Sequence, residues 1–194
     1  PRSIELGAVY DMPVYVASSF SSEPGTLIHG GEQTMEVRKA VTGIAVDSNV
    51  AKITVRGVVD RPGVAAGLLK PLADEGVSVD VIVQNTSSDG TTDFTFTVGQ
   101  ASVVKAAQLI EDQSVIEYAE VITGSNLAKV SIVGTGMENA PGYAARMFST
   151  LSEAKVNIDM ITTSEIRITT IIDREQVQKA VQSLHDAFEL EKSQ

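Results

Sequence analysis

The chain has 194 residues, of which 43% are hydrophobic and 21% are charged, and this is a globular composition with room for one large domain or two small ones. Its formal net charge of −10 makes nucleic acid an unfavourable partner, and no apolar run approaches the roughly 20 residues of a membrane helix. The absence of cysteine excludes disulfides and thiolate metal sites, and it fits the reducing conditions of a cytoplasmic protein.

Residues 1–34 differ from the rest of the chain. Two strand-like stretches, 8–10 and 14–18, are followed by loop signals such as Glu23-Pro24-Gly25. The apolar residues of this segment are too few for it to fold alone. We therefore expect the tail of another domain followed by a linker, and the first residue, Pro1 rather than Met, favours a piece of a longer protein.

A regular pattern begins near residue 40. Residues 41–46 form a short apolar stretch typical of a strand, and residues 51–59 alternate with a period of two. Residues 88–91 (Ser-Asp-Gly-Thr) indicate a hairpin turn. The pattern after residue 50 predicts a β-α-β-β-α-β unit, with strand 51–59, helix 64–75, strand 77–84, strand 94–98, helix 102–112 and strand 115–122.

The turn between the first strand and the first helix is Asp-Arg-Pro-Gly at residues 60–63. Pro62 suits the first position of a helix, and Asp60 suits the N-cap. Gly76 suits the C-terminal stop of the same helix.

The chain then repeats itself. Residues 49–52 (Asn-Val-Ala-Lys) recur as 126–129 (Asn-Leu-Ala-Lys), an offset of 126 − 49 = 77. The second copy is expected to contain strand 128–134, helix 143–154, strand 156–163, strand 166–172 and helix 174–188, with no fourth strand. The strand at 41–46 can supply it, so we expect one domain of residues 48–123 to be inserted into a discontinuous domain made of 40–47 and 124–190.

These residues resemble a known family. Residues 84–87 (Gln-Asn-Thr-Ser), 156–159 (Val-Asn-Ile-Asp) and 164–168 (Ser-Glu-Ile-Arg-Ile), in two units that each carry a Pro-Gly turn, resemble the ACT domains of the regulatory half of aspartate kinase. Residues 18–28 resemble the end of its kinase domain, whose opening Lys-Phe-Gly-Gly-Thr is absent. The resemblance implies an α+β fold of two ferredoxin-like units with antiparallel sheets, and a regulator that does not phosphorylate aspartate by itself.

The residues around the first helix suit an amino-acid ligand. A helix N-terminus attracts a carboxylate, and the small residues Gly63 and Ala65 let a ligand approach the backbone. Asp60 can meet an ammonium group, and Gln84 can hydrogen-bond a polar side chain. Simpler readings exist, since Asp60 is most often only a helix cap and Asn157 can simply close a turn. The repetition of the whole set favours the functional reading.

The resemblance extends this site to both units, and it implies threonine, lysine or both as effectors, a homodimer, and a kinase catalytic domain or large subunit as partner. No cofactor or metal is expected. The alternatives are a ligand-free dimerisation module and a catalytic ferredoxin-like domain. The candidate effector-binding residues are Asp60, Arg61, Pro62, Gly63, Val64, Ala65, Ser78, Val79, Asp80, Gln84, Tyr143, Ala144, Asn157, Ile158, Ser164 and Glu165.

Three weaker patterns are set aside. Residues 134–139 are similar to a dinucleotide-binding loop, but Asn139 replaces the third glycine. Asp89 and Asp93 flank a hairpin tip, where two solvated carboxylates are commoner than a metal site. His29 and His185 stand without a nucleophile pattern and are expected at the surface.

Overall fold

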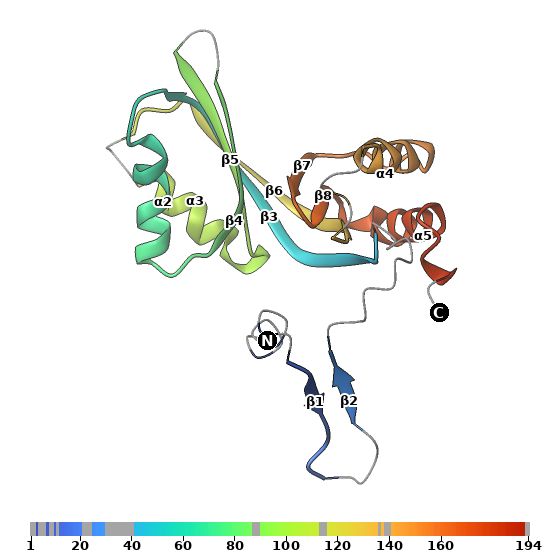
Figure 1. Ribbon diagram of the computed structural model, residues 1–194. Helices are drawn as coiled ribbons and strands as arrows, with labels where there is room; N and C mark the ends of the chain where they lie inside the picture. Colours follow the sequence, from blue (N-terminus) through green and yellow to red (C-terminus); the bar gives the residue numbers. More distant parts are fainter. Residues whose placement is uncertain are drawn as a thin grey trace. The chain divides into compact units, whose positions relative to one another are not determined.

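The computed structural model describes residues 3, 7, 10, 12–20, 25–29, 41–86, 90–112, 116–135, 137 and 141–192. Contacts divide the chain into two units, residues 1–38 and 39–194. In the first unit, β1 (Val14–Val16) pairs antiparallel with β2 (Thr26–Ile28) (Figure 1). Of the strand expected at 8–10, only Tyr10 is described, and it lies in a turn.

The second unit is built around one six-stranded antiparallel sheet with the strand order β4-β5-β3-β6-β8-β7 (Figure 1). Its elements are β3 (Gly43–Val59), α2 (Val64–Asp74), β4 (Val79–Thr86), β5 (Thr91–Val98), the 3-10 helix η1 (Gln100–Ser102), α3 (Val103–Glu111), β6 (Glu120–Val133), α4 (Tyr143–Glu153), β7 (Met160–Ser164), β8 (Arg167–Asp173), η2 (Arg174–Gln176), α5 (Val177–Ala187) and η3 (Leu190–Lys192).

Two long strands, β3 and β6, run through both repeats. The sequence predicts separate strands at 41–46 and 51–59, whereas the structure joins them in β3, with register shifts on either side of Val50. Extra residues in a paired strand are absorbed by a bulge, so residues 47–49 do not interrupt the pairing. β6 likewise joins the end of the first repeat to the start of the second, and it begins at Glu120 rather than at residue 115.

The second repeat obtains its fourth strand from the start of β3. Gly43 to Asp47 pairs with Val133 to Lys129 of β6, whose other side pairs with β8 from Leu127 to Val133. Each repeat occupies one half of the six-stranded sheet, called here its half-sheet. The half-sheet of the second repeat is therefore completed by residues that precede the first repeat. The predicted fold class, two ferredoxin-like units of which the second is discontinuous, is confirmed.

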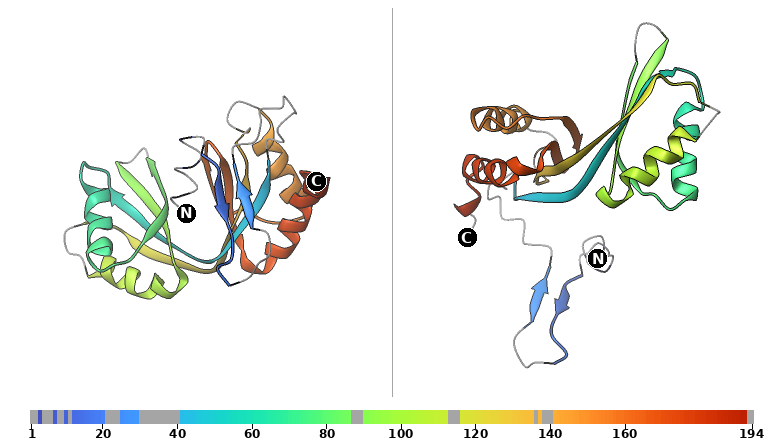
Figure 2. Two further views of the ribbon diagram at one scale, coloured as in Figure 1. Left: turned by 60° about the horizontal axis from the view of Figure 1, so that its bottom comes forward. Right: turned by 180° about the vertical axis from the view of Figure 1, so that it is seen from behind.

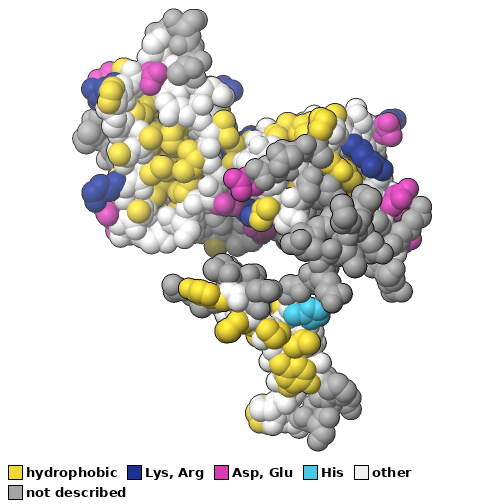
Figure 3. Space-filling model, viewed as in Figure 1, with side chains coloured by type: hydrophobic (Ala, Val, Ile, Leu, Met, Phe, Trp, Pro, Cys, Tyr) yellow, Lys and Arg dark blue, Asp and Glu magenta, His cyan; other side chains and the backbone are white. Residues whose placement is uncertain are grey.

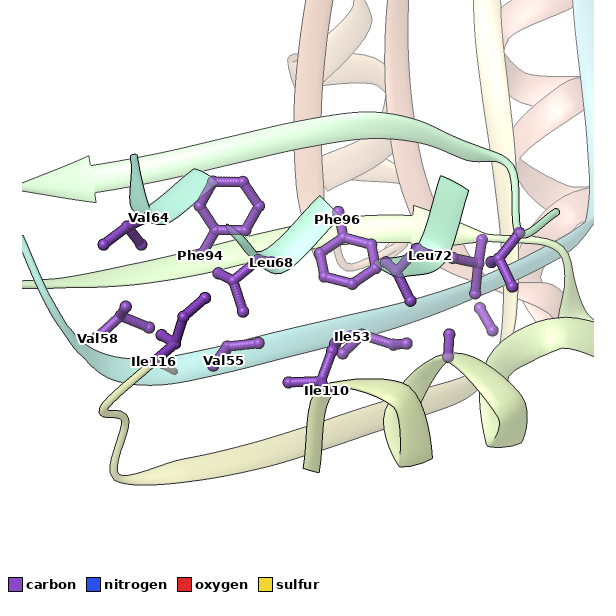
Figure 4. Close-up of a cluster of buried hydrophobic side chains, with 14 residues drawn as sticks. Ile53, Val55, Val58, Val64, Leu68, Leu72, Phe94, Phe96, Ile110 and Ile116 are labelled. Carbon is purple, nitrogen blue, oxygen red and sulfur yellow. The ribbon is translucent and has the colours of Figure 1, made fainter. Parts of the chain in front are cut away.

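The helices lie on the outer side of the curved sheet, with α2 and α3 beside one half and α4 and α5 beside the other (Figure 2). Each pair of helices closes its own hydrophobic core. In the first repeat, Leu68, Leu72, Phe94 and Phe96 are almost completely buried (Figure 4). The core of the second repeat consists of Val41, Val130, Ile132, Met137, Met147, Leu151, Val156, Ile168, Ile172, Ala180, Leu184 and Phe188.

Candidate amino-acid-binding site

The turn before α2 differs from the sequence prediction. Gly63, with φ 96° and ψ −10°, is the N-cap residue, and it makes no side-chain capping bond. The Val64 N–H donates to the Arg61 carbonyl over 3.3 Å, so residues 61–64 form a type II turn with Pro62 and Gly63 at its centre. The predictions that Asp60 caps the helix and that Pro62 begins it are wrong, because the Pro-Gly pair favours this turn over a helical start.

The turn leaves the start of α2 open for a ligand. A Cβ atom at Gly63 would meet no atom within 4 Å. The N–H groups of Ala65 and Ala66 belong to the first helical turn, where no carbonyl of the helix can accept from them. These groups and the positive end of the helix dipole favour a bound carboxylate.

The structure divides the candidate residues of the first repeat into two groups. Residues 60–65 and Gln84 lie at one end of the half-sheet, where the Asp60 N–H donates to the Gly90 carbonyl. Ser78, Val79 and Asp80 lie at the other end, because Val79 pairs with Val98. Asp80 and Gln84 are four positions apart, which corresponds to about 13 Å of strand. One small ligand therefore does not contact both groups in the same half-sheet.

The second repeat shows the same division. Gly142, with φ 106°, is the N-cap of α4, which begins with Tyr143 and Ala144. Ser164 ends β7, and Glu165 follows it in the turn to β8 at this end of the half-sheet. Asn157 and Ile158 precede β7 at the opposite end. Together with Phe148, Ser152, Lys155 and Val156 they line a wide, shallow cavity of about 470 Å³.

Two lysines form ion pairs on the face of the sheet opposite the helices, called here the helix-free face. The Lys52 ammonium lies 2.5 Å from Asp159, and the Lys129 ammonium contacts both Asp80 and, at 3.1 Å, Asp47. Each lysine thus pairs with the aspartate of the other repeat. β6 and β4 are three strand spacings apart, about 14 Å in a flat sheet, so the curvature of the sheet brings Lys129 and Asp80 together.

Lys129, Asp80 and Asp47 form a charged cluster, called here the Lys129 cluster, in which the pKa values of Lys129 and Asp47 are shifted. Burial alone would lower the pKa of Lys129, but the hydrogen bonds that its ammonium donates to Asp80 and Asp47 outweigh this effect, and the pKa of Lys129 is raised. The pKa of Asp47 is lowered, mainly because the Asn49 N–H donates to its carboxylate, with a smaller contribution from Lys129. Both groups are therefore held in their charged forms.

A cavity of about 220 Å³ lies beside this cluster on the helix-free face. It brings together two candidate residues from different repeats, Asp80 and Ser164. The remaining lining residues, which sequence reasoning missed, are Val81, Ile82, Lys129, Thr162, Thr163, Arg167 and Thr169. The only sequence signal was the recurrence of Lys52 as Lys129, since the cavity joins β4 of the first repeat to β6 and to the hairpin of β7 and β8, which lie far from β4 in the chain.

Other kinds of site find no support in the described part of the chain. No group of three or more His, Cys, Asp or Glu side chains there is placed to hold a metal ion. Asp89 and residues 136, 138 and 139 of the loop at 134–139 lie outside the described residues. None of the described helices has both the length and the apolar character needed to cross a bilayer.

Comparison with known proteins finds two matches to ACT domain families, at residues 53–114 and 130–188. The chain is 44% identical over 193 residues to an aspartokinase of Pseudomonas aeruginosa, covering 98% of this chain and 47% of that protein. It therefore spans about half the length of the curated relatives it matches.

Two of the similar solved structures contain chains that this chain covers almost completely. The chain is 45% identical to a chain in the crystal structure of aspartokinase alpha and beta subunits, with a TM-score of 0.73, covering 78% of this chain and 100% of that one. It is 38% identical to the ligand-free regulatory subunit of aspartate kinase from Thermus thermophilus, with a TM-score of 0.72, covering 77% of this chain and 99% of that one.

Proposed function

Because the chain belongs to the aspartokinase family and contains its paired ACT domains, we propose that it is an allosteric amino-acid sensor that imposes feedback inhibition by threonine, lysine or both. The family resemblance expected from the sequence is confirmed. The partner that receives the signal is a kinase catalytic domain or a separate catalytic subunit, and we place the complex in the cytoplasm. Residues 48–123 form the inserted domain, and residues 40–47 with 124–190 form the second domain.

One repeated observation carries this proposal. Both repeats begin their first helix with a glycine of positive φ, Gly63 and Gly142, whose missing side chain faces open space. In the first repeat, the effector carboxylate is bound by the N–H groups at the start of α2, its ammonium by Asp60 and its side chain by Gln84. Tyr143, Ala144 and Glu165 form the corresponding group of the second repeat, whereas Ser164 lies beside Arg167 in the cavity on the helix-free face.

The division of the candidate residues favours a homodimer. Ser78, Val79, Asn157 and Ile158 lie too far along their half-sheets to complete the same-repeat sites, so a second copy supplies them. β4 and β7 are the two edge strands of the sheet, and Ile82 and Ile161 on them are 47% and 46% exposed. Hydrophobic side chains also gather around α2 and β4 on the visible face of the first repeat (Figure 3). Edge strands with exposed apolar side chains tend to pair with a strand of another chain.

Calorimetric titration of the full chain with threonine and with lysine tests the proposal. We expect saturable binding, and we expect Ala65→Phe to weaken it by more than about tenfold, because the ring would fill the space at the helix start. Ala73→Phe is the matched control, since Ala73 is exposed near the other end of the same helix.

Circular dichroism checks the fold of both variants. Unchanged binding in a folded Ala65→Phe variant would show that the pocket is placed wrongly. A chain that binds neither amino acid at millimolar concentration would contradict the proposal and favour the ligand-free dimerisation module, which the exposed isoleucines of β4 and β7 also fit.

A further inference from the structure

We propose that the 220 Å³ cavity on the helix-free face binds a small, neutral α-amino acid within a single chain, with its carboxylate on Arg167 and its ammonium on Asp80. This inference rests on the proposed function and deepens it, since it assigns an amino-acid site that lies away from the helix N-termini and is complete without a second copy.

The charges around the cavity match a zwitterion. Among the described residues, the Arg167 guanidinium has no ion-pair or hydrogen-bond partner, although it lines the cavity. Arginine binds carboxylates through paired N–H groups, so this side chain is available for the ligand carboxylate. Its position at the start of β8 places it beside the hydroxyl groups of the cavity.

Asp80 supplies the opposite charge. Lys129 contacts its Oδ2 atom, whereas Oδ1 has no partner among the described residues, and the side chain is 63% exposed. Asp47 also pairs with Lys129, so Asp47, Asp80, Lys129 and Arg167 together carry no net charge. A neutral zwitterion leaves this balance unchanged, whereas lysine would add a cation beside Arg167 and Lys129.

The cavity walls favour a small polar side chain. Thr162 and Thr169 are direct neighbours on β7 and β8, and the Thr169 hydroxyl lies 2.7 Å from that of Ser131. Ser164, which pairs with Arg167, adds another hydroxyl. Hydroxyl groups both donate and accept, so they can bind a ligand hydroxyl such as that of threonine or serine. Val81 and Ile82 form the apolar part of the wall.

The first repeat lacks the residue that binds the carboxylate. Ser131 bonds Thr169 and its counterpart Thr54 bonds Thr95, an offset of 169 − 95 = 74 within this strand. The same offset places Asp93 where the second repeat has Arg167, since 167 − 74 = 93. The Asp93 carboxylate accepts from the Gly57 N–H over 3.0 Å. A carboxylate at this position repels the ligand carboxylate, so each chain contains one such site rather than two.

The test compares Arg167→Gln with Arg56→Gln in the full chain, using calorimetry and the methyl NMR signals of Thr162 and Thr169. Arg56 lies on the same face, and within the described part of the chain its guanidinium pairs only with exposed Glu120, so it controls for the loss of a surface arginine. The probes are L-threonine, N-acetyl-L-threonine, which lacks the ammonium group, and L-threoninamide, which lacks the carboxylate.

We expect L-threonine to shift both methyl signals, and Arg167→Gln to weaken that response at least about tenfold, since a charge-assisted bond is lost. Arg167→Lys should recover part of it, and Arg56→Gln should match the parent chain. Neither modified probe should shift the signals. A threonine response that survives Arg167→Gln but disappears in Ala65→Phe overturns this inference and leaves the proposed function standing. Absence of any amino-acid binding overturns both.

Discussion

Replacement of Gly63 by alanine isolates the backbone conformation on which the helix start depends. An added Cβ meets no neighbour, so the change introduces no clash, and only the positive φ of 96° opposes it. A left-handed conformation costs an L-residue about 1–2 kcal/mol. Alanine also lowers the conformational entropy of the unfolded chain, and this effect stabilises the folded state by about 0.4–1 kcal/mol. We therefore expect Gly63→Ala to reduce the free energy of unfolding by about 1 kcal/mol.

Gly142→Ala should behave alike, because Gly142 has a φ of 106° and equally open surroundings. The two glycines lie in different repeats, so the double variant should lose about twice as much as either single variant. Gly43→Ala is the matched control, since its Cβ also meets nothing within 4 Å and its φ is not in the left-handed region.

Urea denaturation followed by circular dichroism measures the difference. We expect Gly43→Ala to be as stable as the parent chain or slightly more stable. If Gly63→Ala were as stable as Gly43→Ala, the positive φ would not restrict the residue, and the argument for a glycine-built helix start would fail.

Three further predictions concern the ligand, the Lys129 cluster and the assembly. Gln84→Ala should weaken effector binding about threefold to tenfold, the value of one neutral hydrogen bond, whereas Gln108→Ala on the exposed side of α3 should leave calorimetric titration unchanged. The lowered pKa of Asp47 contributes stability above the unfolded value of about 3.9 and loses it as the pH falls through the lower folded value. The stability advantage of the parent chain over Asp47→Asn should therefore shrink in urea denaturation below about pH 4, and a constant advantage would contradict this assignment. Sedimentation should show a dimer that threonine or lysine tightens, and a monomer under all conditions would refute the shared sites.

Local sequence determined the elements and their repetition. The period-two alternation of residues 51–59 and the helical spacing after Val64 reflect burial against one core, which each segment encodes by itself. Gly76, with φ 71°, ends its helix as the sequence predicts. The sequence also predicted which segment supplies the fourth strand of the second repeat. In the predicted pattern, that repeat has only three strands of its own, and the strand at 41–46 belongs to neither copy.

Tertiary structure alone decided where the candidate residues meet. The periodicity of a sequence carries no information about the curvature of the sheet. That curvature brings Asp80 of one repeat into contact with Lys129 of the other, and into the same cavity as Arg167, across strands that are not neighbours. Periodicity also does not determine the pairing register of the strands. The register separates Asp80 from Gln84 and places Ser78 and Asn157 at the far ends of their half-sheets. Such contacts arise from long-range packing of the whole sheet, so no single stretch of sequence contains them.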